Sequence, residues 1–208
     1  MPDFRAYAPA VPTDATEIQL SPEESHHLVS VNRCGRGDPV TAFDGRGAEW
    51  LTECLDPSKS TVVLRVRESR PAKPRPHEIT LAQALPKGAT MEDIVRQATE
   101  IGAARIVPLL SERTQVHLDG DRADKKLGKW RTTAIEAAKQ CGNPWLPEIT
   151  AIQPLATFLL SAKDFDLKLI ASLHGGATSL KKSLGAYAAK HGHSPRKVLW
   201  LVGPEGDF

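Results

Sequence analysis

The sequence predicts an α/β protein in which a small β-rich region precedes a larger region of alternating strands and helices. Residues 60–68 alternate apolar and polar side chains, as a strand with one buried face does. From residue 79 onward, short apolar runs alternate with longer amphipathic segments, which indicates strands and helices in turn. A proline-rich stretch at residues 71–77 separates the two patterns and divides the chain into two domains.

The first domain is predicted to span residues 1–70 and to contain one helix. Ser21-Pro22-Glu23-Glu24 is a capping-box pattern with proline at the first helical position, and the helix is expected to end near Cys34-Gly35. In the strand 60–68, Val62 and Leu64 are expected to face the core while Arg65 faces away from it. The strands of this domain are predicted at residues 40–43, 48–55 and 60–68.

The linker at residues 71–77 is rich in proline and basic. Three prolines within residues 71–76 favour an extended, semi-rigid segment. Lys73 and Arg75 extend the series of basic residues that begins in the strand before the linker.

The second domain is predicted to span residues 78–208 and to be built on a parallel sheet, because strands and helices alternate in it. Its strands are predicted at residues 79–85, 105–110, 167–172 and 198–202. Its helices are predicted at residues 90–101, 122–141 and 180–190, with a short one opening at Pro154. The run 198–202 is wholly apolar, which indicates a strand covered on both faces. Two helices show apolar stripes expected to be buried, Met91, Ile94, Val95, Ala98 and Ile101 on the first and Leu127, Trp130, Ala134, Ala137 and Cys141 on the second.

The composition of the chain excludes several classes of protein but does not identify its function. The chain has 208 residues, a formal net charge of +2 and three cysteines with no Cys-x-x-Cys spacing. Scattered cysteines favour reduced thiols in a cytoplasmic protein over a disulfide framework or a zinc site. His26 and His27 are neighbours on a helix and diverge by about 100°, so they do not chelate one metal together. No apolar run reaches the length of about 20 residues that spans a bilayer, so neither a membrane nor a metal is expected as a partner.

Two glycine-containing loops follow predicted parallel strands of the second domain. Leu173-His174-Gly175-Gly176 comes after one strand, and Gly203-Pro204-Glu205-Gly206 comes after the final one. Ligands of open α/β sheets bind at such carboxyl ends. Glu205 suits a ligand that offers hydroxyl or amine donors or a positive charge, and neither loop matches a dinucleotide-binding or phosphate-loop fingerprint. An ordinary strand-to-helix turn explains the same residues.

Ser111-Glu112-Arg113 stands just past another strand end. Arg113 is suited to stabilise negative charge that develops on a substrate oxygen. A salt bridge from Arg113 to a neighbouring carboxylate explains its position equally well.

Basic residues gather in and beside the first domain, and phosphate contacts need such an array. A solvated strand face is the alternative for any one of them. The set comprises Arg5, Arg33, Arg36, Arg46, Arg65, Arg67, Arg70, Lys73 and Arg75.

Ordered motifs along nearly the whole chain resemble one family. They include His26-His27-Leu28 with Arg33, Phe43-Asp44-Gly45, Lys87-Gly88 with Met91-Glu92, Ala98-Thr99-Glu100-Ile101-Gly102, Pro108 with Ser111-Glu112-Arg113, Glu136-Ala137 with Gln140-Cys141-Gly142, Pro147-Glu148-Ile149, Ile170-Ala171 and Gly203-Pro204-Glu205-Gly206. With these motifs the chain resembles the bacterial 16S ribosomal RNA (uracil-N3)-methyltransferases of the RsmE type, in the SPOUT superfamily.

The resemblance implies a PUA-like β-barrel that helps to hold RNA, followed by a SPOUT-type α/β domain with a trefoil knot. It implies a cytoplasmic homodimer that uses S-adenosyl-L-methionine to methylate N3 of one uridine in 16S rRNA of the small ribosomal subunit. Arg113 would stabilise the uracil anion, and either Glu205 or water would take the N3 proton. The basic set named above, apart from Arg46, would contact RNA. The cofactor would be held at Leu173, Leu201, Val202, Gly203, Pro204, Glu205 and Gly206.

Two departures from the family pattern carry expectations of their own. Asn143 stands where relatives often have arginine, which weakens an RNA contact there. Relatives also continue with further helices and a strand after Gly-Pro-Glu-Gly. We therefore expect the knot to be incomplete in this chain and its cofactor binding to be poor. A pure RNA-binding module, and a SPOUT enzyme acting on a ribose hydroxyl, are the competing hypotheses.

Overall fold

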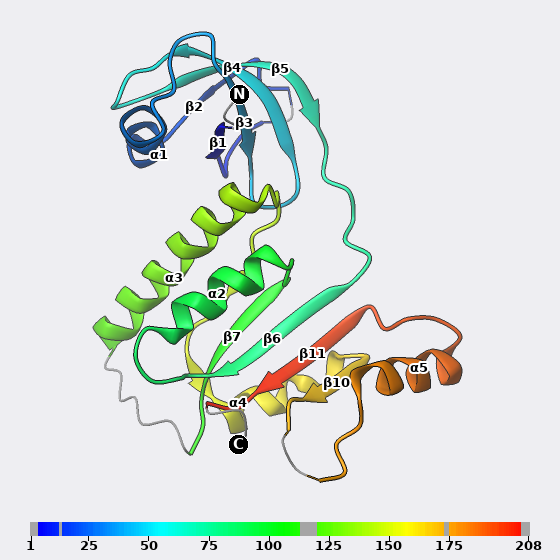
Figure 1. The fold of residues 1–208 in the computed structure, drawn as a ribbon. Coiled ribbons are helices and arrows are strands. Elements are labelled where there is room, and N and C mark those ends of the chain that lie inside the picture. Colours follow the sequence, from blue (N-terminus) through cyan, green and yellow to red (C-terminus); the bar gives the residue numbers. More distant parts are fainter. Residues whose placement is uncertain (1–3, 13, 113–119, 173–174, 205–208) are drawn as a thin grey trace. The chain divides into compact units, whose positions relative to one another are not determined.

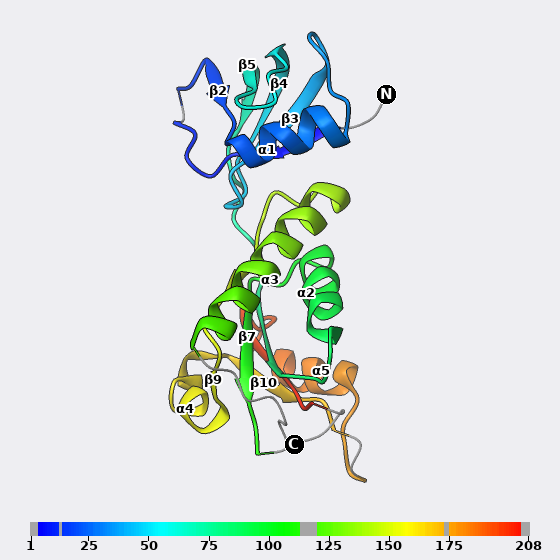
Figure 2. The ribbon, with the colours of Figure 1, turned by 90° about the vertical axis from the view of Figure 1, so that its left-hand side faces the viewer.

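The computed structural model describes residues 4–12, 14–112, 120–172 and 175–204 (Figures 1 and 2). Contacts between Cα atoms divide the chain into two compact units. Unit 1 comprises Met1–Pro74 with Ile135–Leu146, and unit 2 comprises Arg75–Ala134 with Pro147–Phe208. The sequence analysis counted residues 135–146 with the second domain.

Unit 1 is built on a five-stranded sheet with the strand order β1-β3-β4-β5-β2. Beside the expected strands it contains two short ones that the sequence analysis did not predict, β1 and β2. The strands are β1 (Phe4–Tyr7), β2 (Glu17–Gln19), β3 (Pro39–Phe43), β4 (Glu49–Asp56) and β5 (Val63–Arg70). Val62 and Leu64 are fully buried, as predicted, and belong to a core that also includes Trp50 and Leu28.

The helix of unit 1 begins as predicted but ends earlier. In α1 (Pro22–His26), the Ser21 hydroxyl accepts a hydrogen bond from the Glu24 amide at 3.2 Å, which satisfies a backbone donor of the first turn. A π-helical turn, His27–Val31, continues it. The chain leaves the helix through Arg33, whose positive φ of 61° is unusual for a residue with a side chain.

Residues 135–146 belong to unit 1 because their side chains pack on its turns. Lys139 is 7% exposed, and its ammonium donates to the Glu24 carboxylate at 3.1 Å. The Leu146 amide donates to the Gly45 carbonyl at 2.8 Å. Gly47 has a φ of +97°, and a Cβ at this position would lie 2.3 Å from the Trp145 ring, so only glycine lets that ring lie there.

Unit 2 is built on a parallel sheet with the order β10-β11-β6-β7-β8, in which the short β9 also pairs with β7. Its strands are β6 (Glu78–Ala84), β7 (Arg105–Leu110), β8 (Glu148–Ile149), β9 (Gln153–Pro154), β10 (Leu167–Ile170) and β11 (Lys197–Val202). Its helices are α2 (Thr90–Glu100), α3 (Gly120–Cys141), α4 (Leu155–Leu160) followed by the 3-10 turn η2 (Ala162–Asp164), and α5 (Leu180–His191). The predicted α/β class and parallel pairing are confirmed, and α3 ends within the part of the chain that belongs to unit 1.

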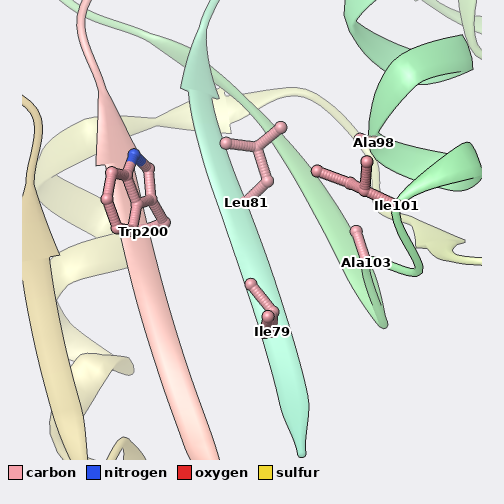
Figure 3. Close-up of a pocket in the computed structure, with 6 residues that line it drawn as sticks. All are labelled: Ile79, Leu81, Ala98, Ile101, Ala103 and Trp200. Carbon is pink, nitrogen blue, oxygen red and sulfur yellow. The ribbon is translucent and has the colours of Figure 1, made fainter. Parts of the chain in front are cut away.

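The two faces of the unit 2 sheet are covered unequally. On one face, Phe158 of α4 packs with Ala82, Val107 and Leu199 in a closed core. On the other face, Met91 and Val95 of α2 are buried, but an apolar depression of about 330 Å³ remains (Figure 3). It is lined by Ile79, Leu81, Ala98, Ile101, Ala103 and Trp200.

Three expectations about burial were wrong. Ile101 is 83% exposed, because it follows the last turn of α2 and borders the depression instead of the sheet core. Trp200 is only half-buried, so β11 is not covered on both faces. Cys141, at the last position of α3, is exposed, and the buried side of that helix is formed by Trp130, Ala134, Ala137 and Ala138.

Candidate active site

The carboxyl ends of the central strands of unit 2 lie side by side at one edge of the sheet. The register pairs Ile170 with Leu201, Val202 with Gln83, and Ala84 with Leu109. The pairing of β10 with β11 extends one residue further, because the Ala171 amide donates to the Leu201 carbonyl at 2.9 Å. Four loops, after β6, β7, β10 and β11, therefore leave the sheet at this edge, which is where open α/β sheets bind ligands.

Gln83 fixes the turn that follows β11. Its side chain is 5% exposed and lies near the carboxyl end of β6. The side-chain amide donates to the carbonyls of Gly203 at 3.2 Å and Ala84 at 2.8 Å. A buried amide is retained at such a place because its hydrogen bonds offset its desolvation. The sequence analysis missed Gln83, although a side-chain amide within the mostly apolar run 79–85 was a usable signal.

The cofactor residues predicted on β11 and its turn lie together at this edge. Leu201 and Gly203 are buried, while Val202 and Pro204 are half-buried. Backbone carbonyls and amides lie here beside apolar side chains, which suits a ligand with both polar and flat apolar parts. Arg113, Leu173, Glu205 and Gly206 lie outside the described residues.

The apolar depression of Figure 3 is a different place. Its six lining side chains carry no polar atom except the indole nitrogen of Trp200. Ile79 lies near the start of β6 and Ala103 precedes β7, so the depression reaches toward the amino ends of these strands. A ligand with hydroxyl, amine and carboxylate groups would find few partners there.

The predicted RNA-contact residues of unit 1 fall into two groups. Arg5 is 9% exposed; its guanidinium donates to Glu49 at 2.7 Å and lies over the Phe43 ring, so Arg5 is a packed structural residue and not a surface contact. Arg67 pairs with Glu53, and Arg70 pairs with Glu68 at 2.8 Å. The hydrogen bonds from these arginines hold the pKa of Glu53 and of Glu68 below the ordinary value.

The rest of the predicted set is exposed or linked to neighbours. Arg65 lies opposite Glu17 on β2 and Glu53 on β4, so the outer face of this sheet alternates acids and bases. Arg46 donates to the Pro9 carbonyl at 2.7 Å. Arg75 is half-buried and has a bonding partner. Of the predicted RNA-contact residues, Arg33, Arg36, Arg65 and Lys73 are exposed and form no ion pair with another described residue.

Other kinds of site are not found in the described ranges. No group of three or more histidine, cysteine or carboxylate side chains there is arranged to hold a metal ion. None of the described helices combines the length and apolar character needed to cross a membrane.

The fold and the arrangement of these strand ends define a class: an α/β protein with a candidate ligand site at the carboxyl ends of a parallel sheet and with a second, small β domain. A family model described as an RNA methyltransferase domain matches residues 73–208, and one described as an RNA methyltransferase PUA domain matches residues 20–67. The chain belongs to this RNA methyltransferase family.

Individual relatives are similar over most of the chain. The "Ribosomal RNA small subunit methyltransferase E" of Synechocystis is 34% identical over 97% of this chain, and that of Bacillus subtilis is 30% identical over 93%. The chain spans 63% and 75% of the lengths of these two relatives. The structure of the Neisseria gonorrhoeae protein of the same name, bound to S-adenosyl methionine, is 27% identical with a TM-score of 0.84, covering 99% of this chain and 81% of that one.

Proposed function

We propose that this chain carries the catalytic domain of an enzyme that methylates N3 of a uridine in 16S rRNA of the small ribosomal subunit, with S-adenosylmethionine as methyl donor. The observation that supports this proposal most directly is the carboxyl edge of the unit 2 sheet, where Gln83 fixes the turn after β11, in a chain of the RNA methyltransferase family.

The residues at this edge fit the cofactor. S-adenosylmethionine offers an amine, ribose hydroxyls and an adenine amino group as donors, and backbone carbonyls at the ends of β10 and β11 are suitable acceptors. Leu201, Val202 and Pro204 would pack against the adenine, and Leu173, Gly203, Glu205 and Gly206 would complete the pocket. When bound, the cofactor supplies a methyl group on a positively charged sulfur.

The chain's own residues would then assist removal of the proton from the substrate nitrogen and stabilise the negative charge that results. Uracil N3 carries a proton, and its removal spreads negative charge onto O2 and O4. Arg113 comes three residues after the end of β7 in the sequence, and we assign it the stabilisation of this charge. Glu205 follows β11 and is assigned removal of the proton, with a water molecule as the alternative.

Unit 1 would hold the RNA through phosphate contacts from Arg33, Arg36, Arg65, Arg67, Arg70, Lys73 and Arg75. Arg5 is omitted because Glu49 and Phe43 already occupy its guanidinium. The ion pairs of Arg67 and Arg70 are exposed and therefore weak, so a phosphate can replace the carboxylate at small cost.

We also propose the remaining family properties for this protein: the trefoil knot, a cytoplasmic location and a homodimer. The uncovered apolar surface around Ile101 and Trp200 supports association of two copies, because apolar surface of this kind marks contact sites. Light scattering of the purified chain across a concentration series measures the assembly state.

Methyl transfer is tested by product analysis. The chain, and a version extended with the carboxyl-terminal segment of the Bacillus subtilis relative, are incubated with methyl-labelled S-adenosylmethionine and undermethylated small subunits. The proposal predicts label in N3-methyluridine after digestion to nucleosides. Label in a ribose-methylated nucleoside would move the reaction to a hydroxyl, and RNA binding without label from either version would leave an RNA-binding module.

A further inference from the structure

Helix α3 carries a row of basic side chains near its start, which we call the α3 basic stripe. It consists of Arg122, Lys125, Lys126 and Lys129. At about 100° per residue these four positions fall within an arc of about 100° on one side of the helix. The buried side of α3, formed by Trp130 and Ala134, lies on a different arc, so the stripe flanks the packed face.

The α3 basic stripe lies near the carboxyl ends of the unit 2 strands, where the candidate active site is. The Lys129 ammonium is 2.8 Å from the Glu92 carboxylate, and Glu92 is in the first turn of α2. Because α2 follows the carboxyl end of β6, this ion pair places Lys129 at the carboxyl edge of the sheet. Lys125 is one helical turn closer to the start of α3, about 6 Å further along. Figure 1 shows the starts of α2 and α3 at the same end of unit 2 as the carboxyl ends of β6 and β11.

The charge of the stripe is incompletely neutralised. Lys125 is exposed, Lys126 is half-buried, and neither forms an ion pair with another described residue. Lys129 has an exposed, weak pair with Glu92, and Arg122 also has a partner. Asp121 and Asp124 are the acidic residues of the same stretch, so together with Glu92 three carboxylates stand against four cations.

We propose that the α3 basic stripe binds phosphate groups of the RNA on either side of the target nucleotide. This inference rests on the proposed function and adds a second RNA contact surface to it, in unit 2. A target base that reaches the carboxyl edge brings its flanking backbone to the helix starts around that edge. Exposed lysines there are suited to hold phosphates without reading sequence.

The test is RNA binding by Lys125→Gln with Lys126→Gln, measured as fluorescence anisotropy of a labelled fragment of small-subunit rRNA over a series of salt concentrations. The matched control is Lys190→Gln with Lys197→Gln, which removes the same charge near the amino end of β11. Both double variants lower the formal net charge from +2 to 0. Circular dichroism checks that both fold.

The stripe variant is expected to bind roughly 10-fold more weakly, with a salt slope smaller by about 1.4–1.8, while the control keeps the wild-type slope. Equal slopes for the stripe variant and wild type would overturn the inference, and so would an equal loss in the control. If the stripe variant still binds RNA but no longer binds polyglutamate, the surface would be assigned to an acidic protein instead.

The inference and the proposed function fail separately. If the wild type forms N3-methyluridine and the stripe variant keeps the wild-type salt slope of RNA binding, only the proposed role of the α3 basic stripe is wrong. RNA binding that depends on the stripe, without any methylated nucleoside, would remove the methyl-transfer proposal and leave the contact surface.

Discussion

The two basic surfaces of the molecule differ in how their charges are balanced. On the outer face of the unit 1 sheet, Arg67 and Arg70 each form an ion pair with a carboxylate, and Arg65 lies opposite Glu17 and Glu53. On α3, Lys125 and Lys126 form no ion pair among the described residues. The sequence shows basic residues at both places but not the acidic residues that neutralise them. A basic cluster in a sequence therefore indicates a binding surface only when the structure shows that its charges are not paired with nearby acids.

The largest effect is expected where a charge is buried, and α3 offers a matched pair of lysines. Lys139 is 7% exposed and lies 3.1 Å from Glu24 and 2.6 Å from Glu136, whereas Lys129 is 65% exposed beside Glu92. Lys139→Met should lower the free energy of unfolding by about 3 kcal/mol, because it leaves Glu24 buried without its cation.

Lys129→Met should cost less than about 1 kcal/mol. Urea denaturation, with amide exchange of β3 and β4 as the readout for unit 1, measures both variants. Equal losses would show that burial does not separate the two pairs.

The next effect separates structural from binding arginines. Arg5→Met should destabilise the protein by about 2–3 kcal/mol, since Glu49 then loses its buried partner, and should leave the salt slope of RNA binding unchanged. Arg67→Met should cost less than about 1 kcal/mol and should reduce the slope. An altered slope with intact stability in the Arg5 variant would return Arg5 to the RNA surface.

A smaller effect concerns Gln83. Gln83→Leu keeps the side-chain size but leaves the carbonyls of Ala84 and Gly203 without their donor, which should cost about 1–2 kcal/mol. Cofactor affinity by calorimetric titration should fall as well, because the turn after β11 loses its anchor. Unchanged affinity in a destabilised variant would show that Gln83 supports the sheet and not the ligand site.

The smallest effect is a pH dependence on the unit 1 sheet. The hydrogen bond from Arg67 lowers the pKa of Glu53, so Glu53 contributes stability above its unfolded pKa and loses it as pH falls through the folded value. Between about pH 6 and pH 3, the urea midpoint of Arg67→Met should fall less steeply than that of the wild type. Parallel curves would mean that the exposed pair contributes nothing measurable.

Elements with strong periodicity were predictable from sequence, and elements defined by distant partners were not. The alternation of Val62 and Leu64 located β5, and the stripe through Met91 and Val95 located α2. The strands β1 and β2 have four and three residues, too few to show a period. Ile101 continues the α2 stripe in sequence, but periodicity does not report how far the opposing surface extends.

The candidate site was predictable in part for the same reason. An apolar strand followed by Gly-Pro placed Leu201 to Pro204 at the carboxyl edge. Gln83 escaped notice because the Gly203 carbonyl that it anchors is 120 residues away along the chain, and only the parallel pairing of β6 with β11 brings the two together. The ion pairs of Arg5 and Arg67 likewise depend on strand register.

Amide hydrogen exchange with and without saturating S-adenosylmethionine, on the chain and on its extended version, tests the central claim that the ligand site is the carboxyl edge of the unit 2 sheet. We predict added protection at Val202 and Gly203, at Ala171 and Ser172 after β10, and at Ser111 after β7. The amino ends of the strands, including Ile79 and Ala103 at the apolar depression, should exchange as before. Protection confined to the depression around Trp200, or no change in either version, would contradict the account.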